Sequence, residues 1–598
     1  MVQPATAASV QGDFSTGTIT LNGRRYRLRV AKGDYFITEA YLTGTDREHR
    51  VEYTLGNRRI QHYLTTIENG RIVVLPPSWD VQRRLWFDNM EIVRPDENDQ
   101  KPVQQWNKNC FGCHVSQQNN NYRPAQGTYA TTWEDFGTSC ERCHGPGSTH
   151  VQAYERAESG HPLAEHSIVR PTRLDAKTSS AICAQCHSMR DIVAPDYTAG
   201  DEYFDYFQPI LEYAPRNVND PPYWPDGRPR RFSNDAIGLW QSECFLRGGA
   251  TCTSCHRDPH LPDIDRNAQL EPTNNALCAS CHRNIVTQLT AHTRHRADSA
   301  GSSCVECHMP KTVISIKATM RDHTMSVPAP ENTVAFGIPN ACTECHRDKK
   351  ASWAVDTVEK WWPHGRRARL IARAEAFTAA RASRPEALNR LIAIAADERQ
   401  GPLIQANAVG YLSNYPDARA LAALLAAATA DYAAIRSAAV SSLGRLAVDS
   451  DARRGAIDAA LDDPRRAVRI AALVSLVIRG GGPPAPAVQP AFRRVSAEFE
   501  ARARLQQDDA GTQRDLGLIR LLTGEFDPAA AALEISVGLE PDRPSARFFL
   551  ALARLGQRRA DDARALLKQV QPSDPFYHAA QERLRQLTPQ EPSRRQIH

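Results

Sequence analysis

The chain has 598 residues, of which 41% are hydrophobic and 24% are charged, and its formal net charge is +5. A chain of this length can form several domains, each with its own core. Because positive and negative charges nearly balance, the composition excludes a polybasic nucleic-acid arm and an acidic tail. The longest apolar runs, residues 421–430 and 470–478, are about half as long as the roughly 20 residues of a membrane-spanning helix. The composition therefore excludes a chain built of membrane-spanning helices, and the odd count of 15 Cys needs an explanation.

Short strands are predicted at the start of the chain. Residues 16–30 alternate apolar and polar side chains around Asn22 and Gly23, a pair typical of a tight hairpin turn. The alternation continues in YFITEAYLTG, HRVEYTLG and RIVVL. We expect a small antiparallel β domain over residues 1–104 that caps the following region. No site chemistry is visible in it, so a structural cover is favoured over a binding module.

The cysteines lie between residues 110 and 345, and fourteen of them form seven C-x-x-C pairs, each followed at once by His. The pairs are Cys110 and Cys113, Cys140 and Cys143, Cys183 and Cys186, Cys252 and Cys255, Cys278 and Cys281, Cys304 and Cys307, and Cys342 and Cys345. The histidines that follow them are His114, His144, His187, His256, His282, His308 and His346.

This spacing has a chemical reason. Two intervening residues let both sulfurs reach the two vinyl groups on one edge of a haem, and the adjacent His then lies beneath the iron as its proximal ligand. Zinc sites and redox dithiols also use C-x-x-C pairs, but neither requires a His after every pair. The pattern therefore predicts seven covalently bound haem c groups in a multihaem cytochrome c domain over residues 105–350.

The sixth coordination position of each iron decides its behaviour. A second His saturates the iron and suits electron transfer, whereas an open position permits substrate chemistry. Histidines close to turns or motifs are candidate distal ligands, with contact to solvent or to a haem propionate as the alternative: His150, His260, His292, His295 and His323. A non-ligand role is favoured where no motif context is present, at His49, His62, His161, His166 and His364.

A stretch rich in Tyr, Asp and Pro, residues 195–232, separates the third and fourth motifs. Loops of this length are usually functional or are packed by their own side chains. A partner surface, a substrate channel and a simple cover over the haems all remain open for this stretch.

The composition shifts toward Ala, Leu and Arg after residue 350, and internal repeats appear. IQANAVGYL, IRSAAVSSL and VRIAALVSL begin at residues 404, 435 and 468, which predicts HEAT-like helical repeats over residues 351–482. Beyond GGGPPAP, Leu516 and Pro541 recur 34 residues later as Leu550 and Pro575, the spacing of tetratricopeptide (TPR) repeats, over residues 483–598. We expect an all-α solenoid that docks a partner protein, with a purely structural clamp on the haem domain as the alternative.

Between residues 53 and 360 the chain resembles multihaem c-type cytochromes of the cytochrome c-554 type that carry C-terminal repeat domains. The resemblance covers roughly half of the chain and rests on YTLGNRRIQHYL, CERCHGPGSTH, CTSCHRDPH, HTRH followed by SSCVECHMPKT, RDHTMSVPAP and PNACTECHRDKKASWA. It implies electron transfer in the periplasm or another extracytoplasmic place, with His150, His260, His292 or His295, and His323 as distal ligands. Similar proteins tend to carry Met where this chain has Cys244, so a free buried thiol is expected there.

The resemblance also concerns the region before Met1. Similar proteins carry one more C-x-x-C-H motif and a Trp- and His-rich segment upstream of a sequence much like QPATAASVQGDFS. Haem c attachment takes place outside the cytoplasm, so an export signal is expected as well. Our hypothesis is that Met1 is an internal or misassigned start and that the natural protein has a signal and an eighth haem.

The sequence therefore predicts a multidomain protein: a β domain, an irregular and α-helical haem region, and an all-α solenoid. Its expected function is to carry electrons through seven iron-containing haems between redox partner proteins, with no nucleic-acid partner. The alternative is an oxidoreductase that reduces a small nitrogen or sulfur compound at one open-site haem. A C-x-x-C-K motif, typical of pentahaem nitrite reductases, is not present in the chain, so an electron carrier is favoured over a catalyst.

Overall fold

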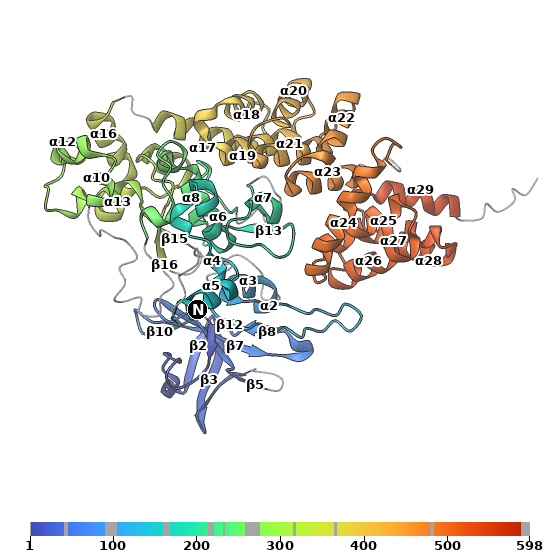
Figure 1. Cartoon of the computed structure of the whole chain (residues 1–598), viewed down its shortest axis with the longest axis horizontal. Helices are drawn as coiled ribbons and strands as arrows, with labels where there is room; N and C mark the ends of the chain where they lie inside the picture. Colours follow the sequence, from blue (N-terminus) through green and yellow to red (C-terminus); the bar gives the residue numbers. More distant parts are fainter. Residues whose placement is uncertain are drawn as a thin grey trace, which may run out of the picture.

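The structure is a computed structural model of the chain. It describes residues 2–40, 46–89, 104–158, 168–212, 221–230, 234–256, 275–314, 318–363, 367–478, 484–543 and 545–587. A β-rich part, a part of short helices and loops, and a part of packed α-helices follow one another along the chain (Figure 1). His161, His166, His260 and His364 lie outside the described residues.

The N-terminal β region consists of antiparallel strands in two main sheets. One sheet has the order β2-β3-β4-β5; the other has the order β1-β6-β7-β9-β10, with β8 paired to β7. The bounds are β1 (Val2–Pro4), β2 (Thr18–Leu21), β3 (Arg24–Ala31), β4 (Asp34–Ala40), β5 (Arg47–Arg50), β6 (Tyr53–Leu55), β7 (Ile60–Thr66), β8 (Ile72–Val74), β9 (Pro77–Asp80) and β10 (Leu85–Asp88). The small antiparallel β region that the sequence predicts is therefore present.

The predicted hairpin turn connects β2 and β3. Asn22 and Gly23 both have positive φ angles, 46° and 76°, which are the angles that a two-residue turn between twisted strands requires. The inward-facing residues of the β region form a compact core that includes Phe14, Tyr63 and Trp79. Alternation of apolar and polar residues thus folds here as the sequence predicts.

The motif-bearing part contains little regular structure beyond short helices and two-stranded ribbons. Its helices are α2 (Trp106–Asn109), α3 (Phe111–His114), α4 (Glu141–His144), α5 (Ser148–Glu158), α6 (Ala176–His187), α8 (Asp235–Gln241), α9 (Glu243–Leu246), α10 (Ala276–Ala279), α11 (Arg283–Val286), α12 (Leu289–Thr293), α13 (Cys304–His308), α14 (Pro330–Phe336) and α15 (Ala341–Cys345). Its ribbons pair β11 (Val115–Ser116) with β12 (Asp135–Phe136), β13 (Arg190–Ile192) with β14 (Phe207–Pro209), and β15 (Lys311–Ile314) with β16 (Ala318–Arg321). Most motif residues lie on a single helical turn, because a C-x-x-C-H sequence spans little more than one turn.

The described part of the stretch between the third and fourth motifs is packed into the interior. Helix α7 (Tyr203–Tyr206) and strand β14 bury Tyr203, Phe204 and Phe207, which join the same core as the C-terminal helices. Glu212, on the same stretch, accepts hydrogen bonds from the Arg381 guanidinium at 2.6 Å and from the Tyr411 hydroxyl at 2.8 Å. The described part of this stretch therefore favours a cover that joins two regions of the chain.

The C-terminal part is entirely helical among the described residues. Its helices are α16 (Ala351–Trp361), α17 (Arg367–Arg381), α18 (Ala387–Ala396), α19 (Pro402–Tyr411), α20 (Ala418–Ala427), α21 (Ala433–Arg445), α22 (Asp451–Ala459), α23 (Arg466–Ile478), α24 (Gln489–Leu505), α25 (Ala510–Leu522), α26 (Phe526–Leu539), α27 (Ala546–Gly556), α28 (Ala560–Leu567) and α29 (Tyr577–Leu587). The three aligned segments of the sequence fall on α19, α21 and α23, which pack side by side. No helix in the described ranges is long and apolar enough to cross a lipid bilayer.

Helix pairs in the last part of the chain approach closely at small residues. A Cβ added to Gly517 on α25 would lie 2.4 Å from the Leu533 side chain on α26, so only glycine permits this distance between the helices. The helical region is present as predicted, while its assignment to HEAT and TPR repeats stays a prediction.

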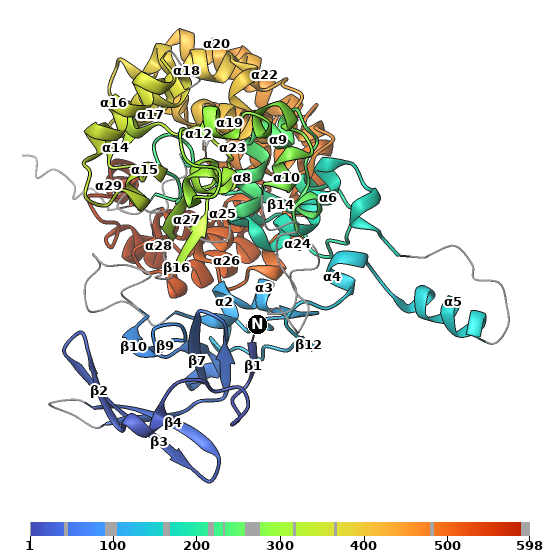
Figure 2. The same cartoon turned by 90° about the vertical axis from the view of Figure 1, so that its left-hand side faces the viewer.

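The C-terminal helices fold back onto the rest of the chain (Figures 1 and 2). Lys108 and Tyr129, which flank the first motif, donate hydrogen bonds to Asp508 at 2.7 and 2.9 Å. The Arg466 backbone amide at the start of α23 donates to the Asp205 carboxylate at 2.8 Å. These contacts fit the structural clamp that the sequence left open as an alternative to partner docking.

Candidate haem-binding sites

Three histidines outside the motifs face a motif histidine. The ring centroids are 6.2 Å apart in each case, in the pairs His323 and His256, His292 and His308, and His295 and His346. Two imidazoles that bind one metal ion from opposite sides, each nitrogen about 2 Å from the ion, have centroids roughly 6 Å apart. The three pairs therefore fit the proximal and distal ligands of haem iron, and the sequence had proposed all three distal candidates.

Hydrogen bonds fix the second ring nitrogen of several of these histidines. Because a backbone carbonyl only accepts, the Nδ1 atom bonded to it carries the hydrogen, and the Nε2 lone pair is left for a metal. Such Nδ1–H groups donate from His144 to Val169 O at 2.8 Å, from His295 to Thr293 O at 2.6 Å, from His308 to Ser326 O at 3.0 Å, and from His323 to Arg321 O at 3.0 Å. The chain thus holds these rings in the tautomer that binds iron.

The β region brings a further histidine to the first motif. His62, on β7, lies within electrostatic range of His114, and burial lowers the pKa of each imidazole to about 4. Both rings are therefore neutral, which is the form that binds metals. The His62 Nδ1 atom is 2.7 Å from the Ser78 hydroxyl on β9. The sequence favoured a non-ligand role for His62. The only signal in the sequence that could have indicated a ligand role was the motif YTLGNRRIQHYL, which contains this histidine.

No such ring pair tests the other two candidate distal ligands, His150 and His260. The His150 ring contacts Tyr154 on its own helix, α5, at 4.6 Å between centroids. Helix α5 projects from the rest of the chain in Figure 2. His260 lies outside the described residues. A ligand role for either histidine stays a prediction.

Cysteines of different motifs lie against one another. The Cys113 thiol of the first motif lies next to that of Cys186 in the third, and the Cys183 thiol of the third lies next to that of Cys252 in the fourth. A further thiol contact joins Cys278 of the fifth motif to Cys304 of the sixth. Three pairs of attachment sites are therefore in direct contact.

Two further pairs of motifs lie within electrostatic range of each other. The sulfur of Cys255, in the fourth motif, lies within electrostatic range of Cys278 in the fifth, and Cys307, in the sixth, lies within range of Cys342 and Cys345 in the seventh. Burial is the main cause that raises the pKa of the Cys307 thiol to about 11. The fourth motif therefore lies near the fifth, and the sixth lies near the seventh.

The second motif is joined through the residues between its cysteines. The Arg142 guanidinium donates to the Gly112 carbonyl of the first motif at 3.3 Å, and the Gln185 amide of the third motif donates to the Arg142 carbonyl at 2.8 Å. The first three motifs therefore form one cluster.

The remaining cysteine, Cys244, is half-buried beside the fourth and fifth motifs. Burial raises the pKa of its thiol, and neighbouring Cys278 and Cys281 raise it further. A neutral thiol in this place agrees with the expected free cysteine.

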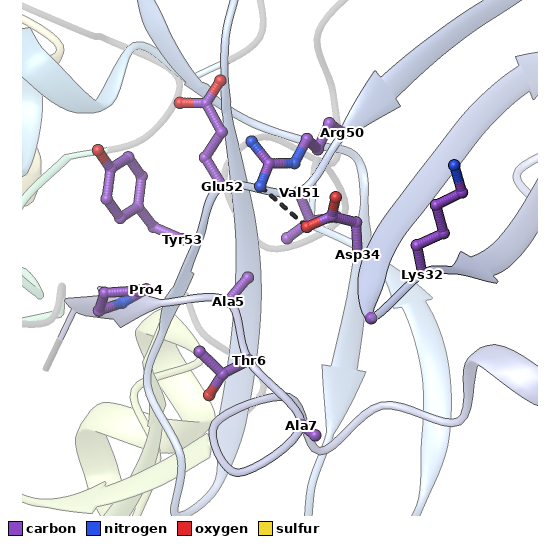
Figure 3. Close-up of a pocket in the computed structure, with 11 residues that line it drawn as sticks. Pro4, Ala5, Thr6, Ala7, Lys32, Asp34, Arg50, Val51, Glu52 and Tyr53 are labelled. Carbon is purple, nitrogen blue, oxygen red and sulfur yellow. Dashed lines mark hydrogen bonds and ion pairs between the residues drawn. The ribbon is translucent and has the colours of Figure 1, made fainter.

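An open cavity of about 560 Å³ lies elsewhere, in the β region (Figure 3). Lys32, Glu52 and the ion pair between Arg50 and Asp34, at 2.9 Å, line it. None of its lining residues belongs to a motif, so this cavity is separate from the haem-binding sites.

Comparisons with known families agree with the site chemistry. Residues 86–145, which contain the first two motifs, match the family described as cytochrome c554 and c-prime. Residues 246–287, which contain the fourth and fifth motifs, match the family described as doubled CXXCH motif. No curated protein sequence matches the chain. The two family matches and the seven C-x-x-C-H motifs support a multihaem c-type cytochrome.

Proposed function

We propose that this protein is an electron-transfer cytochrome that carries seven covalently bound haem groups and passes electrons between redox partner proteins. The proximity of the attachment motifs carries this proposal, because the third motif lies against the fourth and the fifth against the sixth, while cysteines of the fourth and fifth motifs, and of the sixth and seventh, lie within electrostatic range of one another. When bound, each haem supplies iron that changes between the ferric and ferrous states by one electron.

The residues of the chain have distinct tasks in this proposal. The cysteine pairs would hold the haems covalently, and the motif histidines would bind their iron. His292, His295 and His323 would supply the second histidine ligand at the sixth, seventh and fourth motifs, where their rings face the motif histidines. The carbonyls that accept from Nδ1 keep the imidazoles from rotating. Saturated, firmly held ligands suit electron transfer, because the iron changes charge with little rearrangement.

Exposed motif cysteines support exchange with partners. Cys140, in the second motif, and Cys345, in the seventh, are exposed, and so is Cys281 in the fifth. In our proposal electrons enter and leave at the outer motifs, and partner proteins dock on helical surface that the contacts with the haem region leave uncovered. An extracytoplasmic location follows from haem c attachment, and proteins of the cytochrome c554 type are typically found there.

The test is to produce the chain behind an export signal in a host that attaches haem c, and to measure its intact mass and its ferric electron paramagnetic resonance spectrum. We expect a mass increase of seven haems, retained after denaturation, and mostly low-spin ferric signals. Bound zinc in place of haem would overturn the proposal. A high-spin fraction near one seventh of the iron, with turnover of nitrite or hydroxylamine, would favour the alternative of an oxidoreductase.

A further inference from the structure

One carboxylate contacts histidines that belong to two different haem-binding sites. Asp235, the first residue of α8, lies with Oδ2 2.9 Å from Nδ1 of His187 and with Oδ1 3.3 Å from Nδ1 of His323. His187 is the motif histidine of the third site, and His323 faces the motif histidine of the fourth, His256. Asp235 therefore lies between axial ligands of two neighbouring sites.

The packing of α8 holds the carboxylate in this position. The Asn234 side chain accepts from the Met189 backbone amide at 2.8 Å, and the Trp240 indole donates to Ser180 on α6 at 2.7 Å. Gly238 lies three residues after Asp235, on the same face of the helix. A Cβ added to Gly238 would be 3.1 Å from the His323 Cβ atom, so the absence of a side chain lets His323 approach α8.

The charge of Asp235 distinguishes it from the other Nδ1 partners. Once Nε2 binds iron, Nδ1 carries the hydrogen and donates it. The partners of His144, His295 and His308 are backbone carbonyls, which are neutral. His323 also donates its Nδ1 hydrogen to a carbonyl, that of Arg321 at 3.0 Å, so at this ring Asp235 acts through its nearby charge; the hydrogen bond to Asp235 is made by His187. A carboxylate partner draws the shared hydrogen more strongly, makes the imidazole a stronger donor to iron, and favours the ferric over the ferrous state. Its side chain is only about 20% exposed, so water screens this charge weakly.

We propose that Asp235 is a positioning residue shared by the third and fourth haems: it orients His187 through a hydrogen bond, and its charge, which lies beside both His187 and His323, lowers the reduction potentials of both haems together. This inference rests on the proposed function, because it requires haem at both sites. The contact between Cys183 and Cys252 places the two sites side by side. Because one carboxylate lowers the reduction potentials of both haems, the difference between the two potentials stays small.

The test is a spectroscopic redox titration of the purified holoprotein with Asp235→Asn, which keeps the shape of the side chain and removes its charge. We expect two of the seven one-electron transitions to move to higher potential while the others stay in place. The expected change is about tenfold in the preference for ferric iron, which equals about 59 mV for a one-electron couple.

The matched control is Asp175→Asn at the other end of α6, the helix that carries the third motif. Asp175 accepts from the backbone amides of Lys177 and Thr178, and asparagine caps a helix equally well. This variant removes the same charge far from the ligands, so all transitions should keep their wild-type potentials. Asp235→Glu retains the charge, and its two transitions should remain below those of Asp235→Asn.

The outcomes separate the inference from the proposed function. If no transition moves in Asp235→Asn, if all move equally, or if Asp235→Glu raises the potentials as much as Asp235→Asn, the inference is overturned. Should Asp235→Asn fail to fold, the test is the comparison of Asp235→Glu with wild type. Because Asp235→Glu keeps the charge, a rise of about 59 mV in the two reduction potentials of this variant would also contradict the role of the charge. If the wild-type protein shows no c-type haem absorption on reduction, the proposed function fails first.

Discussion

The imidazole ring of His292 lies 6.2 Å from that of His308, and the two ring planes differ by only 13°. His295, three residues further along, faces His346 at the same distance. The short segment AHTRH therefore supplies facing rings to two successive motifs. Trp361, the last residue of α16, contacts the ring of His295, and Trp362, which follows the helix, contacts that of His292, both at 6.0 Å.

Replacement of His292 should leave the iron of one haem without its second histidine ligand. We expect His292→Ala to retain all seven haems, because thioether bonds hold them, and to convert about one seventh of the ferric iron to high spin. Electron paramagnetic resonance of the oxidised protein measures this fraction. His49→Ala, in a half-buried strand position of the β region, is the control and should leave the spectrum unchanged. An unchanged low-spin spectrum in His292→Ala would show that another group binds this iron.

The position of His62 leads to a second prediction. Since the β region places it near His114, we expect His62→Ala to produce a high-spin signal of similar size from the haem of the first motif. Ser78→Ala removes the hydroxyl next to His62 Nδ1 and should leave the iron low-spin, with a shifted signal. If His62→Ala remains fully low-spin, His62 has the non-ligand role that the sequence favoured.

The ion pair that joins the loop after α7 to the C-terminal helices should contribute strongly to stability. The Glu212 side chain is 1% exposed, and Glu212→Ala leaves Arg381 without its buried partner. We expect a loss of about 3 kcal/mol in the free energy of unfolding of the helical region, measured with guanidinium and circular dichroism. Glu375→Ala breaks an exposed pair with Arg390 and should cost less than about 1 kcal/mol. Equal losses in the two variants would contradict this assignment.

A pH-dependent effect is expected where the C-terminal helices contact the first motif. Burial raises the pKa of Asp508, so its ionisation is harder in the folded than in the unfolded chain. Its contribution to stability is therefore lost as pH rises from the unfolded pKa, about 3.9, through the raised folded value. Relative to wild type, Asp508→Asn should gain stability over this interval, as measured by melting temperature against pH.

Asp509, the next residue, provides a control in which stability changes with pH in the opposite direction. Burial opposes the ionisation of Asp509, but hydrogen bonds from Thr512 and the charges of Lys108 and Arg543 together outweigh burial and lower its pKa. The contribution of Asp509 to stability is therefore present above the unfolded pKa and is lost as pH falls. Asp509→Asn keeps a helix-capping side chain and should lose stability relative to wild type as pH rises. The same pH trend in both variants would contradict the assignment of the two carboxyl groups.

The sequence predicted those features that depend on neighbours along the chain. Haem attachment needs two sulfurs and a histidine within five residues, so the seven motifs are visible without a structure. The hairpin at Asn22 and Gly23 follows from local backbone preferences, and the aligned segments fall on α19, α21 and α23 because helix periodicity is also local. His292, His295 and His323 were proposed because they lie close to motifs or turns in the sequence.

Only the tertiary structure decided which groups meet across the chain. His62 approaches His114 because a β strand carries it there, and Asp235 reaches His323 because α8 packs beside it at a glycine. Neither contact produces a periodic pattern or a fixed spacing in the sequence, because contacts between distant segments depend on the packing of whole elements. The sequence by itself thus indicated that the chain binds haem c and predicted the attachment residues, whereas the packing of its elements decided which motifs lie together and which groups surround their histidines.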